Sequence, residues 1–387
     1  MNLEALQVEV HNLIQTDQPE KAEALLRPHL AGGVGPIPLW RQMAVALRRQ
    51  GRMGEVKQIQ LMLVEHNPGD LTARFDLSET LLMLGEYERG WREYQYRYSL
   101  AHTVAIERKV QLPRWSGEAM PGKTLLIHDE QGYGDTFQFI RLTREAARRS
   151  KARVILEVNH EALALARRSL PEFEITARGT LPPRFDVHCE MMSLPMALGL
   201  KLSDLPGPIP YLQPDPARLA HWRNRLAGLP RPLVTLAWAG RPVHPNDANR
   251  SISFDMLAPF AGTGAHFLPV QQGPAAAQAN ITPPGMSSMS LSDEIRDFDD
   301  TAAIFCLTDL LISVDSSPTH LAGALGRPAW VMLPFVPDWR WLINRSDTPW
   351  YPHHRIFRQP KRGDWPGLLN NVATALREFV NQPRQVL

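Results

Sequence analysis

Apolar residues along this chain follow two different periods, and the change falls near residue 104. From residue 3 to that point they recur with the spacing of amphipathic helices, in units of about 34 residues. Beyond it, short apolar runs of strand length alternate with helical stretches, and turns rich in glycine and proline separate them. The first part therefore predicts stacked helix pairs, and the second predicts α/β units with parallel strands.

The helical part, residues 1–104, has the pattern of tetratricopeptide-type repeats. Trp40 and Leu47 stand in the first helix of one unit, Pro68 ends that unit, and the next unit begins near Leu71. About three units are needed for a self-supporting stack, because each helix pair buries its apolar face only against its neighbours. The concave surface of such a stack suits a peptide or protein partner. The alternative is that the helices only brace the following domain or form a dimer contact.

Charge and cysteine content argue against several classes of protein. The chain has 42 basic and 40 acidic residues and a net charge of +2, so it shows no broad electrostatic footprint for nucleic acid. Cys189 and Cys306 lie far apart without a CxxC pair, which argues against a zinc site or a disulfide framework and fits a reducing compartment. The first residues lack a targeting pattern, and no apolar run reaches the ~18 residues of a membrane span. We therefore expect a cytoplasmic protein without a membrane span.

Proline-rich stretches divide the α/β part into segments. Residues 105–122 are expected to form a linker and residues 123–230 the first α/β domain. Residues 231–350 are expected to form the second α/β domain. Residues 351–387 are expected to form a tail whose amphipathic helix, Asp364 to Val380, returns to the first domain.

The first α/β domain begins with a strand predicted over Lys123–Asp129, which leads into a glycine-containing loop and a helix. Gln131, Gly132 and Gly134 in this loop indicate close approach of the backbone to a ligand. Asp135 at the start of the helix would repel a pyrophosphate placed there, which makes it a candidate general base facing an acceptor hydroxyl. A simple cap of the helix is the alternative role for Asp135.

The second α/β domain carries a polar loop after a strand predicted over Leu233–Ala239. Arg241, His244, Asn246 and Arg250 in this loop have the side chains to meet a diphosphate. A plain surface loop is the alternative.

A second strand of this domain, predicted over His266–Gln271, is followed by Gln272 and by a disordered-looking segment that reaches Ser290. The sequence Asp297-Phe298-Asp299 has the form of a metal-binding DxD motif. We interpret it instead as the first turn of a helix, where acidic side chains are favoured.

A turn after the apolar run Leu310 to Val314 has the features of a phosphate site. It consists of Asp315, Ser316, Ser317, Pro318, Thr319 and His320. Small hydroxyl side chains and free backbone amides at a helix N-terminus favour an anion. His320, inside the helix, can give a proton or a hydrogen bond to a diphosphate. Ordinary capping of the helix is the alternative explanation for these residue types.

Two further segments complete the set of motifs. Pro113-Arg114-Trp115 lies in the linker, and Pro337 to Trp341 follows the last strongly apolar run. The aromatic residues of this last segment are candidates for stacking on a base or a sugar, or for a loop packed on the core.

Taken in order, these motifs make the segment from about Leu112 to Arg358 resemble a known enzyme family. It looks like the bacterial tetratricopeptide-repeat glycosyltransferases related to the ADP-heptose heptosyltransferases, and more loosely like the protein O-GlcNAc transferases. The resemblance implies a GT-B fold, in which two Rossmann-like domains face a cleft behind an all-α repeat domain. It also implies a nucleotide-sugar co-substrate held by the second domain, an acceptor held by the first, and no required cofactor or metal.

The resemblance also assigns roles to residues. Asp135 matches the family's catalytic base near the acceptor, and the turn from Asp315 to His320 matches its donor diphosphate site. A lysine that related sequences place in the polar loop or near Gln272 is absent, since Pro245 and Gln272 stand there. Stabilisation of the leaving group would then fall to Arg241, Arg250 or His320.

The sequence thus predicts an inverting glycosyltransferase with Asp135 and His320 as catalytic residues. Its acceptor would be a protein or a glycan, docked on the helical repeats. Two alternatives remain at this stage: a repeat scaffold whose nucleotide-sugar domain no longer catalyses, and a sugar-nucleotide epimerase of the same architecture.

Overall fold

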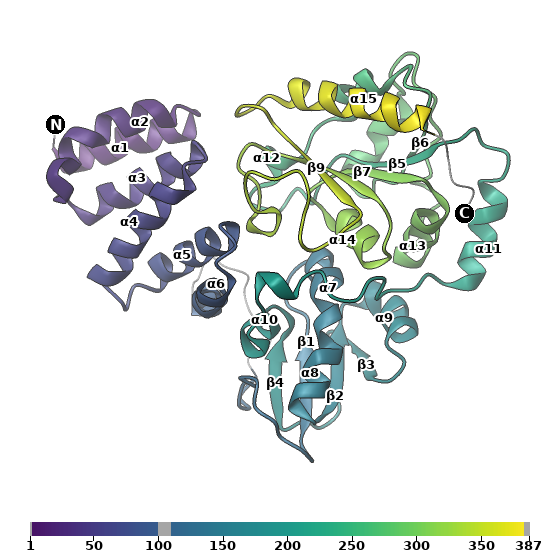
Figure 1. The fold of residues 1–387 in the computed structure, drawn as a ribbon, viewed down its shortest axis with the longest axis horizontal. Helices are drawn as coiled ribbons and strands as arrows, with labels where there is room; N and C mark the ends of the chain where they lie inside the picture. Colours follow the sequence, from purple (N-terminus) through teal and green to yellow (C-terminus); the bar gives the residue numbers. More distant parts are fainter. Residues whose placement is uncertain (1, 100–109, 383–387) are drawn as a thin grey trace. The chain divides into compact units, whose positions relative to one another are not determined.

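The computed structural model describes residues 2–99 and 110–382, and its backbone separates into two compact units (Figure 1). The first unit contains the described residues up to 99 together with residues 200–202 and 335–344. The second unit contains the remainder of the described chain. The predicted boundary between repeats and linker, at residues 104 and 105, lies outside the described residues.

The first unit is helical, as predicted. Successive helices pack against one another along its length. They are α1 (Leu3–Gln15), α2 (Pro19–Leu26), α3 (Ile37–Arg49), α4 (Met53–His66), α5 (Leu71–Met83) and α6 (Tyr87–Tyr94). The start of α5 at Leu71 agrees with the predicted start of a unit. The assignment of these helices to the tetratricopeptide class remains a prediction.

A segment from late in the chain completes the core of the helical unit. Trp339, in the short 3-10 helix Trp339–Trp341, is 2% exposed. Its ring centroid lies 5.2 Å from that of Trp91 and 5.9 Å from that of Tyr94. These aromatic side chains therefore pack in a core, and the idea that this segment stacks on a base or a sugar is wrong for Trp339 and for Trp341, which is also buried.

The second unit contains two parallel sheets, which form its two lobes. The first sheet has the strand order β3-β2-β1-β4. Its strands are β1 (Thr124–His128), β2 (Arg153–Val158), β3 (Glu174–Ala177) and β4 (Val187–Glu190). The helices of this lobe are α7 (Tyr133–Phe139), α8 (Thr143–Ser150), α9 (Leu163–Ser169) and α10 (Leu194–Leu198).

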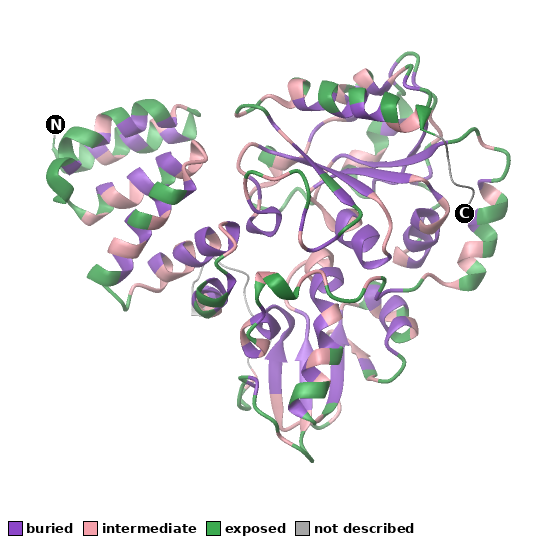
Figure 2. Cartoon of the chain, viewed as in Figure 1, coloured by how far each residue is buried: buried purple, intermediate pink, exposed green. Residues whose placement is uncertain are grey.

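The second sheet has the strand order β6-β5-β7-β8-β9, again with all strands parallel. Its strands are β5 (Leu233–Ala237), β6 (His266–Pro269), β7 (Leu310–Val314), β8 (Ala329–Leu333) and β9 (His354–Arg358). The helices that accompany it are α11 (Pro216–Arg225), α12 (Asp247–Arg250), α13 (Phe298–Leu307), α14 (Ser317–Ala324) and α15 (Trp365–Asn381). Figure 2 shows that these strands are largely buried. Parallel strands with continuous apolar sequences need helices on both faces of the sheet, because both faces must be shielded from water. The predicted α/β fold class with parallel strands is confirmed.

Two predictions about the second lobe are corrected by this topology. The tail does not return to the first lobe, because β9 pairs with β8 and α15 buries Leu368, Val372 and Leu376 in the core of the second lobe. The segment after Gln272 is ordered, since it contains the 3-10 helix Pro274–Asn280 and later a bridge between Phe267 and Ser288.

Each sheet reverses the direction of its strand order at one place. In the first sheet this switch point lies between β1 and β4, and in the second sheet it lies between β5 and β7. Ligands of open parallel sheets bind beyond the carboxyl ends of the strands at such points. Among the described helices, none is both long enough and apolar enough to cross a bilayer.

The acidic residues at the start of α13 are structural, as the sequence indicated. Asp297 is the N-cap and accepts a hydrogen bond from the Asp300 amide, while Asp299 forms an ion pair with Arg168. Asp300 is fully buried and accepts bonds from Trp222 Nε1 at 2.9 Å and Arg218 Nη1 at 3.1 Å. These bonds hold α11 against α13.

We predict that Asp300→Ala destabilises the protein by about 1–3 kcal/mol, because it leaves the buried Trp222 Nε1 without its acceptor and removes one of the two carboxylates that pair with Arg218. Chemical denaturation of the full chain measures the change. Asp255→Ala, at an exposed position, is the control and should stay within about 0.5 kcal/mol of the wild type. Equal stability of the two variants would contradict the anchoring role.

Candidate functional site

The two predicted donor loops lie on either side of the switch point of the second sheet. The loop from Gly240 to Ser251 follows β5, and the turn from Asp315 leads from β7 into α14. Ser316 is the N-cap of α14 and Pro318 stands in its first turn. The first amides of a helix have no partner within the helix, so this end of α14 presents donors beyond the sheet edge.

The hydroxyl groups of this turn are used within the protein. Ser313, Ser316 and Thr319 all donate to the carbonyl oxygen of Val314, at 2.7, 3.3 and 3.1 Å. Thr319 is also completely buried. The predicted contact of the Thr319 side chain with a diphosphate is therefore corrected, because its hydroxyl stabilises the turn. Ser317 and Asp315 remain half-buried at its surface.

Arg250 links the two donor loops. Its Nη1 donates to the carbonyl oxygen of Asp315 at 2.9 Å, and its Nε bonds to Asp247 Oδ1 at 3.3 Å. The guanidinium lies directly over Gly240, where a Cβ atom would stand 2.4 Å from Arg250 Nη2. The Gly240 amide in turn donates to Ser251 Oγ at 2.8 Å. Arg250 therefore fixes the distance between the loops.

The other residues predicted to bind the donor differ in exposure and in hydrogen-bond partners. Arg241 and His244 are exposed on the polar loop, and the Asn246 amide donates to His244 Nδ1 at 3.1 Å. Gln272 Nε2 donates to the Ser292 carbonyl at 2.9 Å. Sequence reasoning missed its neighbour Gln271, which is buried and accepts bonds from the backbone amides of residues 238 and 239, at the end of β5.

His320 lies where the two lobes meet. It is 5% exposed, its Nδ1 is 3.0 Å from the Tyr351 hydroxyl, and its Nε2 is 3.9 Å from Asp315 Oδ1. Helix α7 of the first lobe packs against α14, and a Cβ atom at Gly134 would stand 2.9 Å from His320 Cδ2. The glycine of the acceptor loop is thus required for the contact with the histidine of the donor turn.

The acceptor loop is organised by Asp135. Its Oδ2 accepts a hydrogen bond from the Gly132 amide at 2.9 Å, which is the half of a capping box that the third helical residue supplies at the start of α7. Gln131, Gly132, Gly134 and Asp135 are all half-buried. The structure thus shows the capping role of Asp135, and its role as a base remains a prediction.

Tyr133, at the start of α7, contacts helix α13 of the second lobe and lies near Arg241 of the polar loop. Its ring centroid lies 5.0 Å from that of Phe298 on α13. Burial raises the pKa of the Tyr133 hydroxyl, its hydrogen bond to Glu161 adds to the rise, and the nearby Arg241 guanidinium opposes it. Arg241 is therefore near the loop that carries Asp135.

A cluster of aromatic and basic side chains surrounds Tyr351, the residue whose hydroxyl contacts His320. The Arg141 guanidinium lies 4.2 Å from the Tyr211 ring centroid and 5.4 Å from that of Tyr351. Tyr211 donates to the Phe137 carbonyl at 2.8 Å. The His354 ring packs at a tilt against that of Tyr351, with centroids 4.7 Å apart, and burial lowers the pKa of His354 to about 3. These side chains hold the Tyr351 hydroxyl in place against His320.

A second polar cluster, which the sequence analysis missed, lies at the switch point of the first sheet. It consists of His128 at the end of β1 and His188 and Glu190 on β4, all buried. His128 Nε2 and His188 Nδ1 are 3.1 Å apart, and Arg114 Nη2 bonds to Glu190 Oε1 at 2.6 Å. Burial lowers the pKa of His188, and the Arg114 bond holds the pKa of Glu190 below its usual range although burial opposes this.

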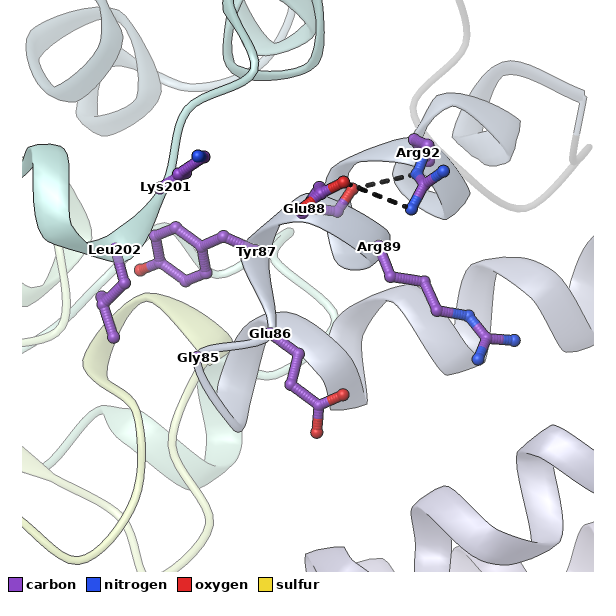
Figure 3. Close-up of a pocket in the computed structure, with 8 residues that line it drawn as sticks. All are labelled: Gly85, Glu86, Tyr87, Glu88, Arg89, Arg92, Lys201 and Leu202. Atoms are coloured by element: carbon purple, nitrogen blue, oxygen red, sulfur yellow. Dashed lines mark hydrogen bonds and ion pairs between the residues drawn. The ribbon is translucent and has the colours of Figure 1, made fainter.

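The helical unit has a hollow of its own, at the start of α6 (Figure 3). It is lined by Gly85, Glu86, Tyr87, Glu88, Arg89, Arg92, Lys201 and Leu202. In Figure 3 the Tyr87 ring points toward Leu202, and Glu88 pairs with Arg92 at 3.8 Å. Charged side chains of both signs therefore surround this hollow.

No protein-family model matches the chain. Among curated proteins, it is similar to protein FlbA of Caulobacter vibrioides, with 31% identity over 342 residues. The match covers 81% of this chain and 56% of FlbA, so the chain spans little more than half the length of that relative.

Among solved structures, the chain is similar to the ADP-heptose LPS heptosyltransferase II of E. coli, with 15% identity and a TM-score of 0.47 over 66% of this chain and 99% of that chain. It is also similar to a glycosyl transferase family 9 protein of Veillonella parvula, with 11% identity and a TM-score of 0.45 over 68% and 99%. An O-GlcNAc transferase variant of Thermobaculum terrenum matches with 11% identity and a TM-score of 0.28 over 97% and 92%.

We predict that His354 makes the protein less stable in mild acid. Its pKa is about 3 in the folded chain and about 6.5 when unfolded, so only the unfolded state takes up a proton between these values. Stability is therefore lost as pH falls below about 6.5, by about 1.4 kcal/mol per pH unit. His354→Gln should reduce the stability difference between pH 7.5 and pH 5 by about 2 kcal/mol in urea denaturation.

His160→Gln is the control, because His160 is exposed and is not among the groups that shift the pKa of His354. It should keep the pH dependence of the wild type. If both variants show the wild-type difference between the two pH values, His354 does not contribute to acid sensitivity.

Proposed function

We propose that this chain is a glycosyltransferase that moves a sugar from a nucleotide-sugar to an acceptor hydroxyl, with inversion at the anomeric carbon. The observation that carries the proposal is the convergence of two loops on the donor turn, from Asp315 to His320, that begins α14. Arg250 brings the polar loop to Asp315, and Gly134 brings the acceptor loop to His320. These are the loops that the sequence motifs singled out.

The donor side of the proposal follows from the position of α14. Its N-terminus stands at the switch point of the second sheet, where open parallel sheets bind nucleotides. The unpaired amides and the helix dipole favour a diphosphate there. Because the hydroxyls of Ser316 and Thr319 bond to Val314, the backbone amides would make these contacts, with Arg241 and His244 added from the exposed loop.

The acceptor side of the proposal assigns Asp135 as the base. It would take the proton of the acceptor hydroxyl while that oxygen attacks the anomeric carbon and the bond to the diphosphate breaks. The charge that develops on the diphosphate would be stabilised by the α14 amides, by Arg241 and by His320. Within this proposal the reaction needs the nucleotide-sugar and the acceptor, and it uses no further cofactor.

The acceptor is proposed to be a protein or a glycan that docks on the helical unit. The hollow at the start of α6 supports this, since Glu86, Arg89 and Lys201 at its rim offer charges of both signs to a polar chain. We propose a cytoplasmic location for the reaction, because Cys189 and Cys306 are free thiols, as fits a reducing compartment.

We predict that the protein binds at least one of ADP, UDP, GDP or CMP in calorimetric titration. Arg250→Ala should weaken that binding about 10-fold or more, because the donor loops lose the hydrogen bond that joins them. Arg223→Ala, at an exposed position of α11, should bind like the wild type. No binding of any of the four nucleotides by the wild type would overturn the proposal.

We predict that Asp135→Asn lowers sugar transfer about 10²–10⁴-fold with unchanged nucleotide affinity, because the amide cannot accept the proton. The asparagine oxygen can still accept the Gly132 hydrogen bond, so the thermal unfolding midpoint should stay close to that of the wild type. Transfer and release of free sugar from the donor are measured separately. Unchanged transfer in Asp135→Asn would remove its catalytic role, and nucleotide binding without any release or transfer by the wild type would indicate a scaffold.

A further inference from the structure

We propose that His128, His188 and Glu190 bind one divalent transition-metal ion, of the class of Zn²⁺ or Fe²⁺, at the carboxyl end of the first sheet. One ligand atom from each of the three residues can be chosen so that all lie within 4.8 Å of one another. Two imidazole nitrogens and one carboxylate oxygen are a donor set that these metals use in proteins. This inference does not rest on the proposed glycosyl transfer.

The strand register brings the three side chains together. In the β1–β4 pair, Leu126 lies opposite His188 and His128 lies opposite Glu190. Residues two apart on a strand point to the same face, so all three side chains stand on one face of the sheet. They also stand at the β1–β4 switch point, where parallel sheets bind ligands.

The distances fit a shared metal. His128 Nε2 and His188 Nδ1 are 3.1 Å apart, and one ligand atom from each of the two histidines and Glu190 lies within 4.8 Å of the others. Two nitrogens bound tetrahedrally to zinc at about 2.0–2.1 Å lie roughly 3.3 Å apart. Small side-chain rotations would therefore complete the coordination, and an open position would remain for water or another oxygen ligand.

Glu190 supplies an independent observation that points to a ligand. The residue is 2% exposed, and within the described part of the chain its Oε2 has no hydrogen-bond partner. A buried carboxylate oxygen without a partner costs free energy, so this atom is a place where an ion would be stabilising. A hydrogen bond between the two imidazoles would satisfy the histidines alone, whereas a metal ion would also satisfy Glu190 Oε2.

The surrounding residues orient these side chains as outer-shell groups of metal sites do. Arg114 Nη2 holds Glu190 Oε1 at 2.6 Å, which leaves Oε2 for the ion. The His188 ring also bonds to the backbone of Leu112, while its Nδ1 faces His128. The backbone of His188 is clamped in addition, since its amide donates to the Pro113 carbonyl and its carbonyl accepts from the Trp115 amide.

The test is titration of the chelator-treated full-length chain with Co²⁺ and Zn²⁺. We expect one Co²⁺ per chain with visible absorption bands of a four- or five-coordinate ion, and displacement by Zn²⁺. His188→Gln and Glu190→Gln should each weaken Zn²⁺ binding 10–100-fold or more. His160→Gln, at an exposed histidine after β2, should bind like the wild type.

Equal metal binding by the wild type and both ligand variants would overturn the proposal, and so would the absence of binding by the wild type. X-ray absorption at the zinc edge of the loaded wild type decides the question even if a variant fails to fold. Scattering from two imidazoles is expected, and a spectrum without imidazole would overturn the assignment to His128 and His188.

Discussion

The tight packing of α14 is the constraint on which the second unit depends. On one side Gly134 lies so close to His320 that a Cβ atom would stand 2.9 Å from its ring. On another side Gly323 lies against Tyr351, where a Cβ atom would come within 2.2 Å of a ring carbon. A side chain at either glycine would force the elements apart. The distances between the acceptor loop, the donor turn and the Tyr351 support are set by these two contacts.

Many polar side chains around α14 are engaged in holding backbone, and this decides what a ligand can meet. Arg250 is bonded to the Asp315 carbonyl, the hydroxyl of Thr319 to the Val314 carbonyl, and Gln272 to the Ser292 carbonyl. Fixed backbone amides and a rigid loop cost little reorganisation when an anion binds. Such a site favours a ligand recognised by shape and charge, with side-chain contacts left to Arg241 and His244 on the exposed loop.

The alternation of apolar runs and helical stretches was enough to predict two parallel α/β halves and the loops that meet at their edges, because parallel strands place their carboxyl ends together. It did not predict β9, an edge strand whose sequence His354 to Arg358 has only two apolar residues, Ile356 and Phe357, and so lacks the apolar run of the other strands. An amphipathic pattern also does not encode which lobe α15 covers. The cluster of His128 and His188 was missed because only the β1–β4 register brings these distant residues together.

The place of Trp339 in the helical unit has a consequence for how the chain matures during synthesis. Trp91 and Tyr94 leave the ribosome early, yet the ring that covers them belongs to a segment made after most of the second unit. Domains usually fold in order from the N-terminus, and exposed aromatic surface promotes aggregation in the meantime. The nascent helical unit therefore has an incomplete core until residues 335–344 have been made, and its exposed aromatic surface can aggregate until then.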